Sequence, residues 1–231
     1  MDIPFGSWSG GQSQATPAAL YDIRYGTNIL NEESKCWPPY FIVTSPSALK
    51  STASFLSKPP VGYNFTNSLD WVHLEYISSL VPKETKLIIA IGGGIVLDAG
   101  KYISLKTSIP LVLVPTIVST GAIIHSVFAK WEGFSTVGSP DSWPWLNAHH
   151  VIVDYSVILD SPFHLNTAGL GDILCSQAGI SEWNYSFRTK TGPPVDSSII
   201  LPVLNQRYKI VKEFPPTLDN SNRLTAKSIK F

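Results

Sequence analysis

Short apolar runs alternate along the chain with segments whose apolar residues recur every three to four positions. The recurring segments, residues 47–56, 69–80 and 96–103, predict helices, and Ser68 is available as the N-cap of the second. The apolar runs predict buried strands; they are Tyr40–Thr44, Leu87–Ile91, Ile109–Val114 and Val151–Asp154. Such strands, alternating with helices, are typical of a parallel sheet covered on both faces. The sequence therefore predicts an α/β fold with a Rossmann-like parallel sheet.

The remaining segments are less regular. Residues 1–19 are rich in Gly, Ser, Gln and Pro and predict a flexible N-terminal arm. Tyr21–Tyr25 and Gly62–Phe65 are weaker strand candidates, and the aromatic, turn-rich residues 128–145 indicate a hairpin or a loop. We therefore expect an α/β domain over residues 20–161.

Beyond Pro162 the pattern becomes helical. Asp172 to about Phe187 is largely apolar and predicts a buried helix. A further helix is expected to begin near Ser198, with Pro202 in its first turn, where the missing N–H does little harm. Residues 162–231 thus predict the start of an all-helical domain that is cut short and that leaves apolar helix faces open to association.

Three consecutive glycines, Gly92–Gly94, lie between a predicted strand and a predicted helix. This arrangement aims backbone N–H groups and a helix N-terminus at an anion such as a phosphate. Neither common fingerprint fits, because Leu97 occupies a glycine position of G-x-G-x-x-G and Tyr102 replaces the Ser or Thr of a Walker A loop. A tight turn without a ligand stays an open alternative. Ligands of parallel sheets bind beyond the strand carboxyl ends, so Gly92–Gly94 and Thr116–Thr120 are expected to flank one cleft.

Composition narrows the class of protein. The chain is 44% hydrophobic and 15% charged, and its 17 basic and 17 acidic residues cancel without forming runs. These values predict a globular protein and favour neither nucleic acid nor a membrane as partner. Cys36 and Cys175 form no metal-type pair, and no secretory signal or bilayer-length apolar run is present, so a cytoplasmic protein is expected.

Three stretches, in this order and at this spacing, resemble the dehydroquinate synthase-like and iron-containing alcohol dehydrogenase superfamily. Within it the resemblance is to glycerol-1-phosphate dehydrogenase and glycerol dehydrogenase types. The stretches are Gly92–Lys101, Val114–Thr120, and Val151–Asp154 followed by Thr167–Leu174. The resemblance runs from about Tyr25 to the C-terminus, but those families continue well past residue 231 into an all-helical domain.

The resemblance implies NAD or NADP and a zinc or iron ion as cofactors. By position, the pyrophosphate-binding segment corresponds to Gly92, Gly93, Gly94 and Asp98, and the loop over the nicotinamide to Thr116, Ser119 and Thr120. Asp172 corresponds to the aspartate that ligates the metal. In such enzymes the metal polarises a substrate hydroxyl so that a hydride passes to the nicotinamide. A second interpretation of Asp98 is helix stabilisation through a pair with Lys101 at i+3.

This chain departs from the family pattern at several positions. Gly121 replaces a substrate-site aspartate, and His125 replaces a cofactor-contacting serine. Thr44-Ser45 stands where an acidic residue often binds the ribose 2′-OH, which is compatible with NADP or with loss of tight binding. The two histidines that complete the metal site in the family lie beyond residue 231. We expect no replacement site: the candidates are three surface or core-edge histidines and a buried helix cysteine, His149, His150, His164 and Cys175.

Three functions follow from these observations. The first is an NAD(P)- and metal-dependent dehydrogenase of a polyol or phosphorylated polyol, impaired by the missing histidines. The second is a sugar-phosphate cyclase, a carbon–oxygen lyase that uses bound NAD transiently. The third is a non-catalytic nucleotide-binding remnant, so enzymatic activity stays undecided here. For residues 1–231 alone we expect weak dinucleotide binding, little turnover, and self-association through the exposed helix faces.

Overall fold

The computed structural model describes residues 22–119, 121–123, 131–132, 135–136 and 150–230. The predicted arm over residues 1–19 and three residues singled out above, Thr120, His125 and His149, lie outside the described residues. The chain divides into two compact units, the first ending at Ser161 and the second beginning at Pro162. Each unit is described by itself below.

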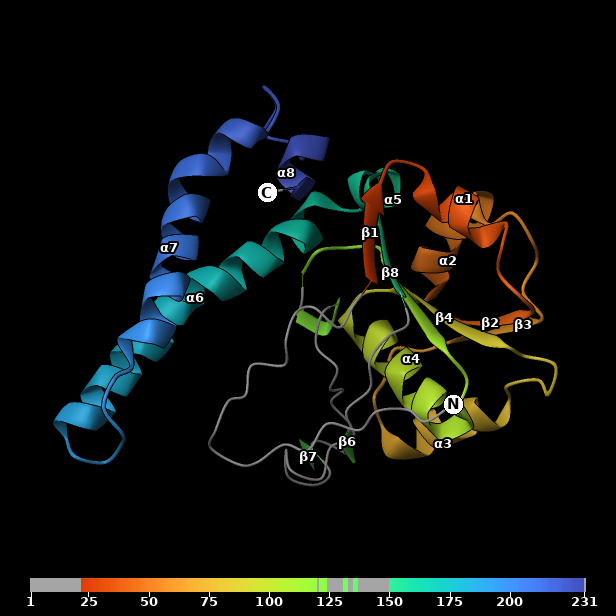
Figure 1. The fold of residues 1–231 in the computed structure, drawn as a ribbon, viewed down its shortest axis with the longest axis horizontal. Coiled ribbons are helices and arrows are strands. Elements are labelled where there is room, and N and C mark those ends of the chain that lie inside the picture. Colours follow the sequence, from red (N-terminus) through yellow and green to blue (C-terminus); the bar gives the residue numbers. More distant parts are fainter. Residues whose placement is uncertain (1–21, 120, 124–130, 133–134, 137–149, 231) are drawn as a thin grey trace. The chain divides into compact units, whose positions relative to one another are not determined.

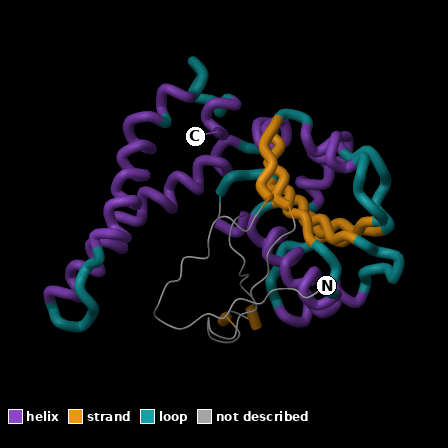
Figure 2. Tube along the Cα trace, viewed as in Figure 1, coloured by secondary structure: helices purple, strands orange, loops and turns teal. Residues whose placement is uncertain are grey.

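A six-stranded parallel sheet forms the centre of the first unit (Figures 1 and 2). Its strand order is β1-β8-β5-β4-β2-β3. The strands are β1 (Asp22–Gly26), β2 (Tyr40–Thr44), β3 (Gly62–Phe65), β4 (Leu87–Gly92), β5 (Leu111–Pro115) and β8 (His150–Asp154). Every residue of β2, β4 and β5 is buried. The predicted α/β fold with a Rossmann-like parallel sheet is confirmed.

Helices cover both faces of this sheet (Figure 1). On one face lie α1 (Ile29–Ser34), α2 (Pro46–Thr52) and α5 (Tyr155–Leu159), with α2 continuing into a 3-10 turn over Ala53–Phe55. Their side chains pack on alternate strand residues in one apolar core that includes Leu30, Tyr40, Ile42, Ile89, Ile91, Val112, Val114, Ile152 and Val157. On the other face lie α3 (Trp71–Ser79) and α4 (Gly94–Thr107). Burial of the strands on both sides explains their uninterrupted apolar runs.

Smaller elements complete the first unit. Two short antiparallel strands, β6 (Trp131–Glu132) and β7 (Ser135–Thr136), lie within the segment for which a hairpin or a loop was predicted. A 3-10 turn spans Gly121–Ile123. The predicted cap of α3 is wrong: the helix begins at Trp71, and Asp70, rather than Ser68, accepts a hydrogen bond from the N–H of Val72 at 3.0 Å.

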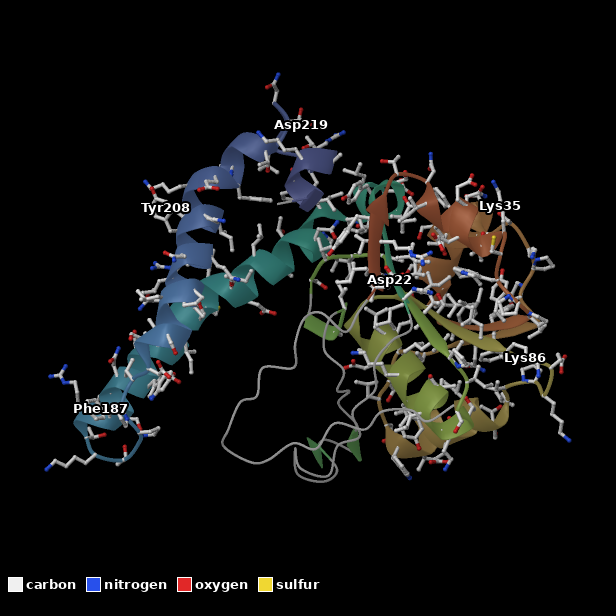
Figure 3. All side chains as sticks on the ribbon, viewed as in Figure 1. Asp22, Lys35, Lys86, Phe187, Tyr208 and Asp219 are labelled. Carbon is white, nitrogen blue, oxygen red and sulfur yellow. The ribbon has the colours of Figure 1, made fainter. Side chains whose placement is uncertain are left out.

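The second unit consists of helices. They are α6 (Phe163–Arg188), α7 (Ser197–Glu213), a 3-10 turn at Pro215–Thr217, and α8 (Ala226–Lys230). Helix α6 begins nine residues before the predicted start, and the prediction that it is buried is wrong. Only Asn166 of α6 is buried, and Phe187 is 46% exposed (Figure 3). Within this unit α6 packs on α7, and one neighbouring helix cannot cover all sides of a 26-residue helix.

Helix α7 begins at Ser197 and is capped by Asp196, whose Oδ1 accepts from the N–H of Ser198 at 2.8 Å. Pro202 therefore lies inside the helix rather than in its first turn as predicted. No helix in the described part of the chain has the length and apolar character that crossing a bilayer requires.

Candidate functional site

The strand order places a topological switch point between β2 and β4. From β2 the chain moves outward to β3, then returns to the opposite side of β2 as β4 and continues through β5 and β8. Ligands of open α/β sheets bind outside the strand carboxyl ends at such a reversal. Here those carboxyl ends are Thr44 and Gly92. A hydrogen bond joins the two strands at this edge, because the Thr44 hydroxyl donates to the carbonyl oxygen of Ile91 at 2.8 Å.

The glycine turn connects β4 to α4 without left-handed backbone. Gly92 ends the strand, and Gly93, at φ −88°, is the residue that precedes the helix. A Cβ on Gly92 would lie 2.8 Å from the Cβ of Val96, and a Cβ on Gly93 would lie 3.0 Å from the Cδ1 of Ile117. The fold itself thus requires glycine at position 92, and it favours glycine at position 93 as well. Space for packing, more than proximity to a ligand, accounts for glycine at these two positions.

Helix α4 starts without a side-chain cap. Its N-cap residue is Gly93, which has no side chain to accept from the first-turn N–H groups. Side chains do cap other helices, among them α2 through Ser45, α3 through Asp70, α5 through Asp154 and α7 through Asp196. The 14 residues of α4 add a helix dipole whose positive end lies at the same place. A glycine turn with open N–H groups at a switch point is an arrangement that binds anions, phosphate in particular.

The loop after β5 lies against this turn, and the cleft that the two loops are expected to flank stays a prediction. Gly92 pairs with Pro115 across the sheet, and the N–H of Thr116 donates to the carbonyl oxygen of Gly92 at 3.1 Å. Thr116 is buried and Ser119 is partly exposed. The structure therefore brings Gly92 and Thr116 together at one edge.

Asp98 forms an ion pair with Lys101 one helical turn later in α4. The Lys101 ammonium lies 2.9 Å from Oδ1 of Asp98; the side chains are 1% and 16% exposed, respectively. Burial lowers the pKa of Lys101, and the Asp98 carboxylate partly opposes that shift. The helix-stabilising interpretation of Asp98 is thus observed, and a part in cofactor binding stays a prediction.

Asp154 is a central residue of this edge to which sequence reasoning assigned no role. It ends β8 and is buried, and its Oδ1 accepts from the N–H groups of Asn28 at 3.1 Å and Ser156 at 2.9 Å. Its Oδ2 accepts from the N–H of Leu30 at 2.9 Å. One carboxylate therefore caps both α1 and α5. An aspartate directly before a short apolar segment is an N-cap signal that could have revealed the α5 contact.

The predicted metal ligand lies in the second unit. Asp172 is exposed on α6, and His164 and Cys175 of the same helix are also exposed, so the prediction of a buried Cys175 is wrong. Among the described residues, no group of three or more His, Cys, Asp or Glu side chains could hold a metal ion. The side chains described here thus do not by themselves fit a catalytic divalent metal, which commonly needs about three protein ligands.

His150 is remote from the glycine turn. It is the first residue of β8, so it lies at the amino edge of the parallel sheet, opposite the edge that carries Gly92. Its Nδ1 lies 2.8 Å from Oδ2 of Asp22, the first residue of β1. His150 is therefore a core-edge residue, as expected, and is no part of the candidate site.

Comparison with known proteins agrees with these features. The family model of iron-containing alcohol dehydrogenases matches residues 49–162. Glycerol-1-phosphate dehydrogenase [NAD(P)+] of Methanococcus aeolicus is 31% identical over 113 residues, which are 49% of this chain and 31% of that protein. Glycerol dehydrogenase of Thermotoga maritima is 30% identical over 170 residues, covering 64% of this chain and 43% of that protein. The chain thus spans less than half the length of these curated relatives.

Solved structures share the fold. A probable glycerol dehydrogenase from Sinorhizobium meliloti superposes with a TM-score of 0.67 at 16% identity, covering 90% of this chain and 61% of that one. A 2-deoxy-scyllo-inosose synthase, solved with carbaglucose-6-phosphate, NAD+ and Co2+, gives a TM-score of 0.55 at 14% identity, covering 67% and 47%. NAD and a divalent metal thus occur together on this fold. Residues 49–162 thus match the iron-containing alcohol dehydrogenase family, and the chain is similar in sequence to glycerol-1-phosphate dehydrogenases and glycerol dehydrogenases.

Proposed function

We propose that the first unit is the dinucleotide-binding domain of an NAD(P)- and divalent-metal-dependent dehydrogenase. The observation that carries the proposal is the open N-terminus of α4, which follows a glycine turn at the switch point between β2 and β4. The pyrophosphate of a dinucleotide is the anion that such a turn suits best, because its oxygens accept from several backbone N–H groups at once.

Specific residues have assigned parts in this proposal. The N–H groups at Gly93 and Gly94 bind the pyrophosphate, and Asp98, held by Lys101, shapes the first turns of α4. Thr116, Ser119 and Thr120 contact the nicotinamide side. The nicotinamide, when bound, accepts a hydride from a substrate carbon. Asp172 is proposed as one metal ligand, and among the described residues it has no further His, Cys, Asp or Glu partners that would complete a metal site.

The substrate class follows from the relatives. Proteins that match this chain are named for the oxidation of glycerol 1-phosphate and glycerol. We propose a polyol or a phosphorylated polyol as substrate, with the hydroxyl-bearing carbon oxidised. A sugar-phosphate cyclase is the second candidate, because 2-deoxy-scyllo-inosose synthase shares the fold. Steady accumulation of NAD(P)H supports the dehydrogenase, whereas product formation without net cofactor change supports the cyclase.

Cofactor binding is the direct test of the proposal. Gly94 is the first residue of α4, where an acidic side chain is compatible with the helix dipole and folding should be preserved. Gly94→Asp places a negative charge at the expected pyrophosphate position, and Gly94→Asn has the same size without the charge. We expect isothermal titration with NAD+ and NADP+ to show at least tenfold weaker binding to Gly94→Asp than to Gly94→Asn. Equal affinities of both variants and the unmodified chain would refute the assignment.

A further inference from the structure

Strand β3 forms one edge of the six-stranded sheet (Figure 1), and within the described part of the chain it pairs with β2 alone. Backbone N–H and C=O groups alternate in direction along a strand. The N–H of Val61, directly before β3, donates to the carbonyl oxygen of Tyr40 on β2 at 2.9 Å. Gly62 and Asn64 therefore direct their N–H and C=O groups away from β2. An open strand edge of this kind is a template for a further strand.

Apolar side chains accompany this open edge. Tyr63 pairs in register with Ile42, so Tyr63 and Phe65, two residues later, lie on the sheet face that α2 covers. Tyr63 and Phe65 are nevertheless 53% and 41% exposed, and their ring centroids lie 5.3 Å apart. Val61, two residues before Tyr63, is exposed as well. The outer side of β3 thus offers apolar surface beside its unpaired backbone groups.

The charges around β3 suit a second copy of the same strand. Edge strands commonly carry charged side chains, lysine in particular, that oppose pairing. Residues 59–69 contain none. The first charges on either side are Lys58, which donates to the carbonyl oxygen of Trp37 at the amino edge of the sheet, and Asp70, which caps α3 beyond the carboxyl end. Antiparallel copies bring each Lys58 towards an Asp70 of the other copy, whereas parallel copies would bring like charges together.

We propose that two copies of this chain pair through β3, antiparallel and about a two-fold axis, so that their sheets join into one. The outward backbone groups set the register, because Gly62 of each copy exchanges hydrogen bonds with Asn64 of the other. Tyr63 then faces Tyr63 of the second copy at a non-hydrogen-bonded position, and Phe65 faces Val61. Such an interface uses the same patch on both copies and closes at the dimer.

A charge at the two-fold axis tests this pairing. Tyr63→Glu places two like charges directly opposite each other, which destabilises a strand pair. The matched control is Tyr25→Glu on β1, the other edge strand, where Tyr25 is 60% exposed. Every chain in the comparison also carries Leu201→Glu and Tyr208→Glu, which remove apolar side chains exposed on α7 and leave β3 unchanged.

Sedimentation equilibrium measures the dissociation constants of these chains, with folding checked by circular dichroism. We expect a dimer for the chain with the two α7 substitutions alone, and dimerisation at least tenfold weaker when Tyr63→Glu is added. Tyr25→Glu should leave the dissociation constant unchanged.

Cross-linking tests the register itself. Cys36→Ser and Cys175→Ser first remove the two exposed free cysteines. Cβ atoms of residues facing each other in an antiparallel pair lie about 4.5–5.5 Å apart, near the span of a disulfide. Tyr63→Cys should therefore form a disulfide-linked dimer under mild oxidation. Asn64→Cys, the control, faces Gly62 of the second copy and should cross-link at least tenfold more slowly.

The remaining outcomes contradict the proposal. A monomer for the chain with the α7 substitutions alone would leave β3 to a partner of another sequence and overturn the pairing of copies. Equal weakening by Tyr63→Glu and Tyr25→Glu, or dimers that persist in Tyr63→Glu, would exclude β3 as the contact. Equal cross-linking rates at positions 63 and 64 would exclude the two-fold register.

Discussion

The ammonium group of Lys101 is almost completely buried and lies 2.9 Å from the Asp98 carboxylate, one turn away on α4. Neutralising one partner of a buried ion pair commonly costs about 3–5 kcal/mol, because the other charge stays buried and loses that opposite charge. We expect Asp98→Asn to lower the free energy of unfolding by about 3 kcal/mol on this basis. Lys101→Met should cost less, since the Asp98 carboxylate is more exposed and partly hydrated.

Urea denaturation of the two single variants and the double variant checks this prediction. The double variant removes both charges, so it should be more stable than Asp98→Asn alone. Additive losses in the double variant would show that the two side chains are not energetically coupled.

Two glycine-to-alanine substitutions should change stability in opposite directions. A Cβ on Gly100 would lie 2.4 Å from the Cβ of Ala90, whereas a Cβ on Gly179 of α6 would have nothing within 4 Å. Gly100→Ala should therefore destabilise the protein by about 1–3 kcal/mol through overpacking. Gly179→Ala should stabilise α6 by about 0.5–1 kcal/mol, because alanine has the higher helix propensity. Thermal unfolding midpoints measured under one set of conditions compare the two; a lower midpoint for Gly179→Ala would contradict the argument.

Asp154 caps two helices at a buried position, so it should contribute more to the free energy of unfolding than an exposed side chain that caps one helix. Asp154→Ala removes the acceptor of three backbone N–H groups at a buried position, so we expect a loss of about 3 kcal/mol. Asp196→Ala removes the exposed cap of α7 and should cost about 1 kcal/mol. Hydrogen exchange adds a local test, since Asp154→Ala should lower protection in α1 as well as in α5. Protection lost in α5 alone would exclude the shared cap.

Tyr102 should make stability depend on pH in the alkaline range. Burial raises the pKa of its phenol above the ordinary value of 10, and a hydrogen bond to Glu75 adds to the shift. Because the folded pKa is the higher one, this contribution is complete below pH 10 and is lost as pH rises from 10 towards the folded pKa. Urea midpoints of the unmodified chain should fall more steeply between pH 9 and 11 than those of Tyr102→Phe. Parallel pH profiles would show that this phenol does not titrate differently on folding.

The exposed apolar side chains of α7 should promote self-association. Leu201, Tyr208 and Val211 are 58%, 62% and 52% exposed (Figure 3 labels Tyr208). Patches of this kind mark interaction surfaces or aggregation sites. We expect sedimentation velocity at micromolar concentration to show oligomers, and replacement of Leu201 and Tyr208 by glutamate to shift the distribution towards monomer. The matched control is Asn205→Glu, at an exposed polar position of the same helix. A single monomer boundary for the unmodified chain would contradict the prediction.

The elements that sequence analysis predicted correctly are those with a strong local signal. The buried strands β2, β4 and β5 are continuous apolar runs, and only a sheet covered on both faces buries such runs completely. Parallel strand order then places the glycine turn beside the loop after β5, which is why Gly92 and Thr116 could be assigned to one edge beforehand. Local pattern and fold agree at these positions.

The errors, and the features for which no prediction was made, occur where the structure depends on contacts between residues distant in sequence. Helix α1 has six residues, and it is capped by Asp154, more than 120 positions along the chain. Ser68 and Asp70 are both able to cap a helix, and the choice depends on where α3 packs. The exposure of α6 depends on its neighbours rather than on its own composition. The engagement of the Thr44 hydroxyl with Ile91 depends on a neighbouring strand that is remote in sequence.

The close approach of Gly100 to Ala90 has a consequence for protein engineering. These two small residues set how deeply α4 seats against β4, and therefore the direction in which the start of α4 points. Transplanting residues 92–94 alone into another α/β scaffold would transfer the loop but not the orientation of the helix N-terminus that follows it. The portable unit is the loop together with positions 90 and 100, although neither position is expected to contact the cofactor.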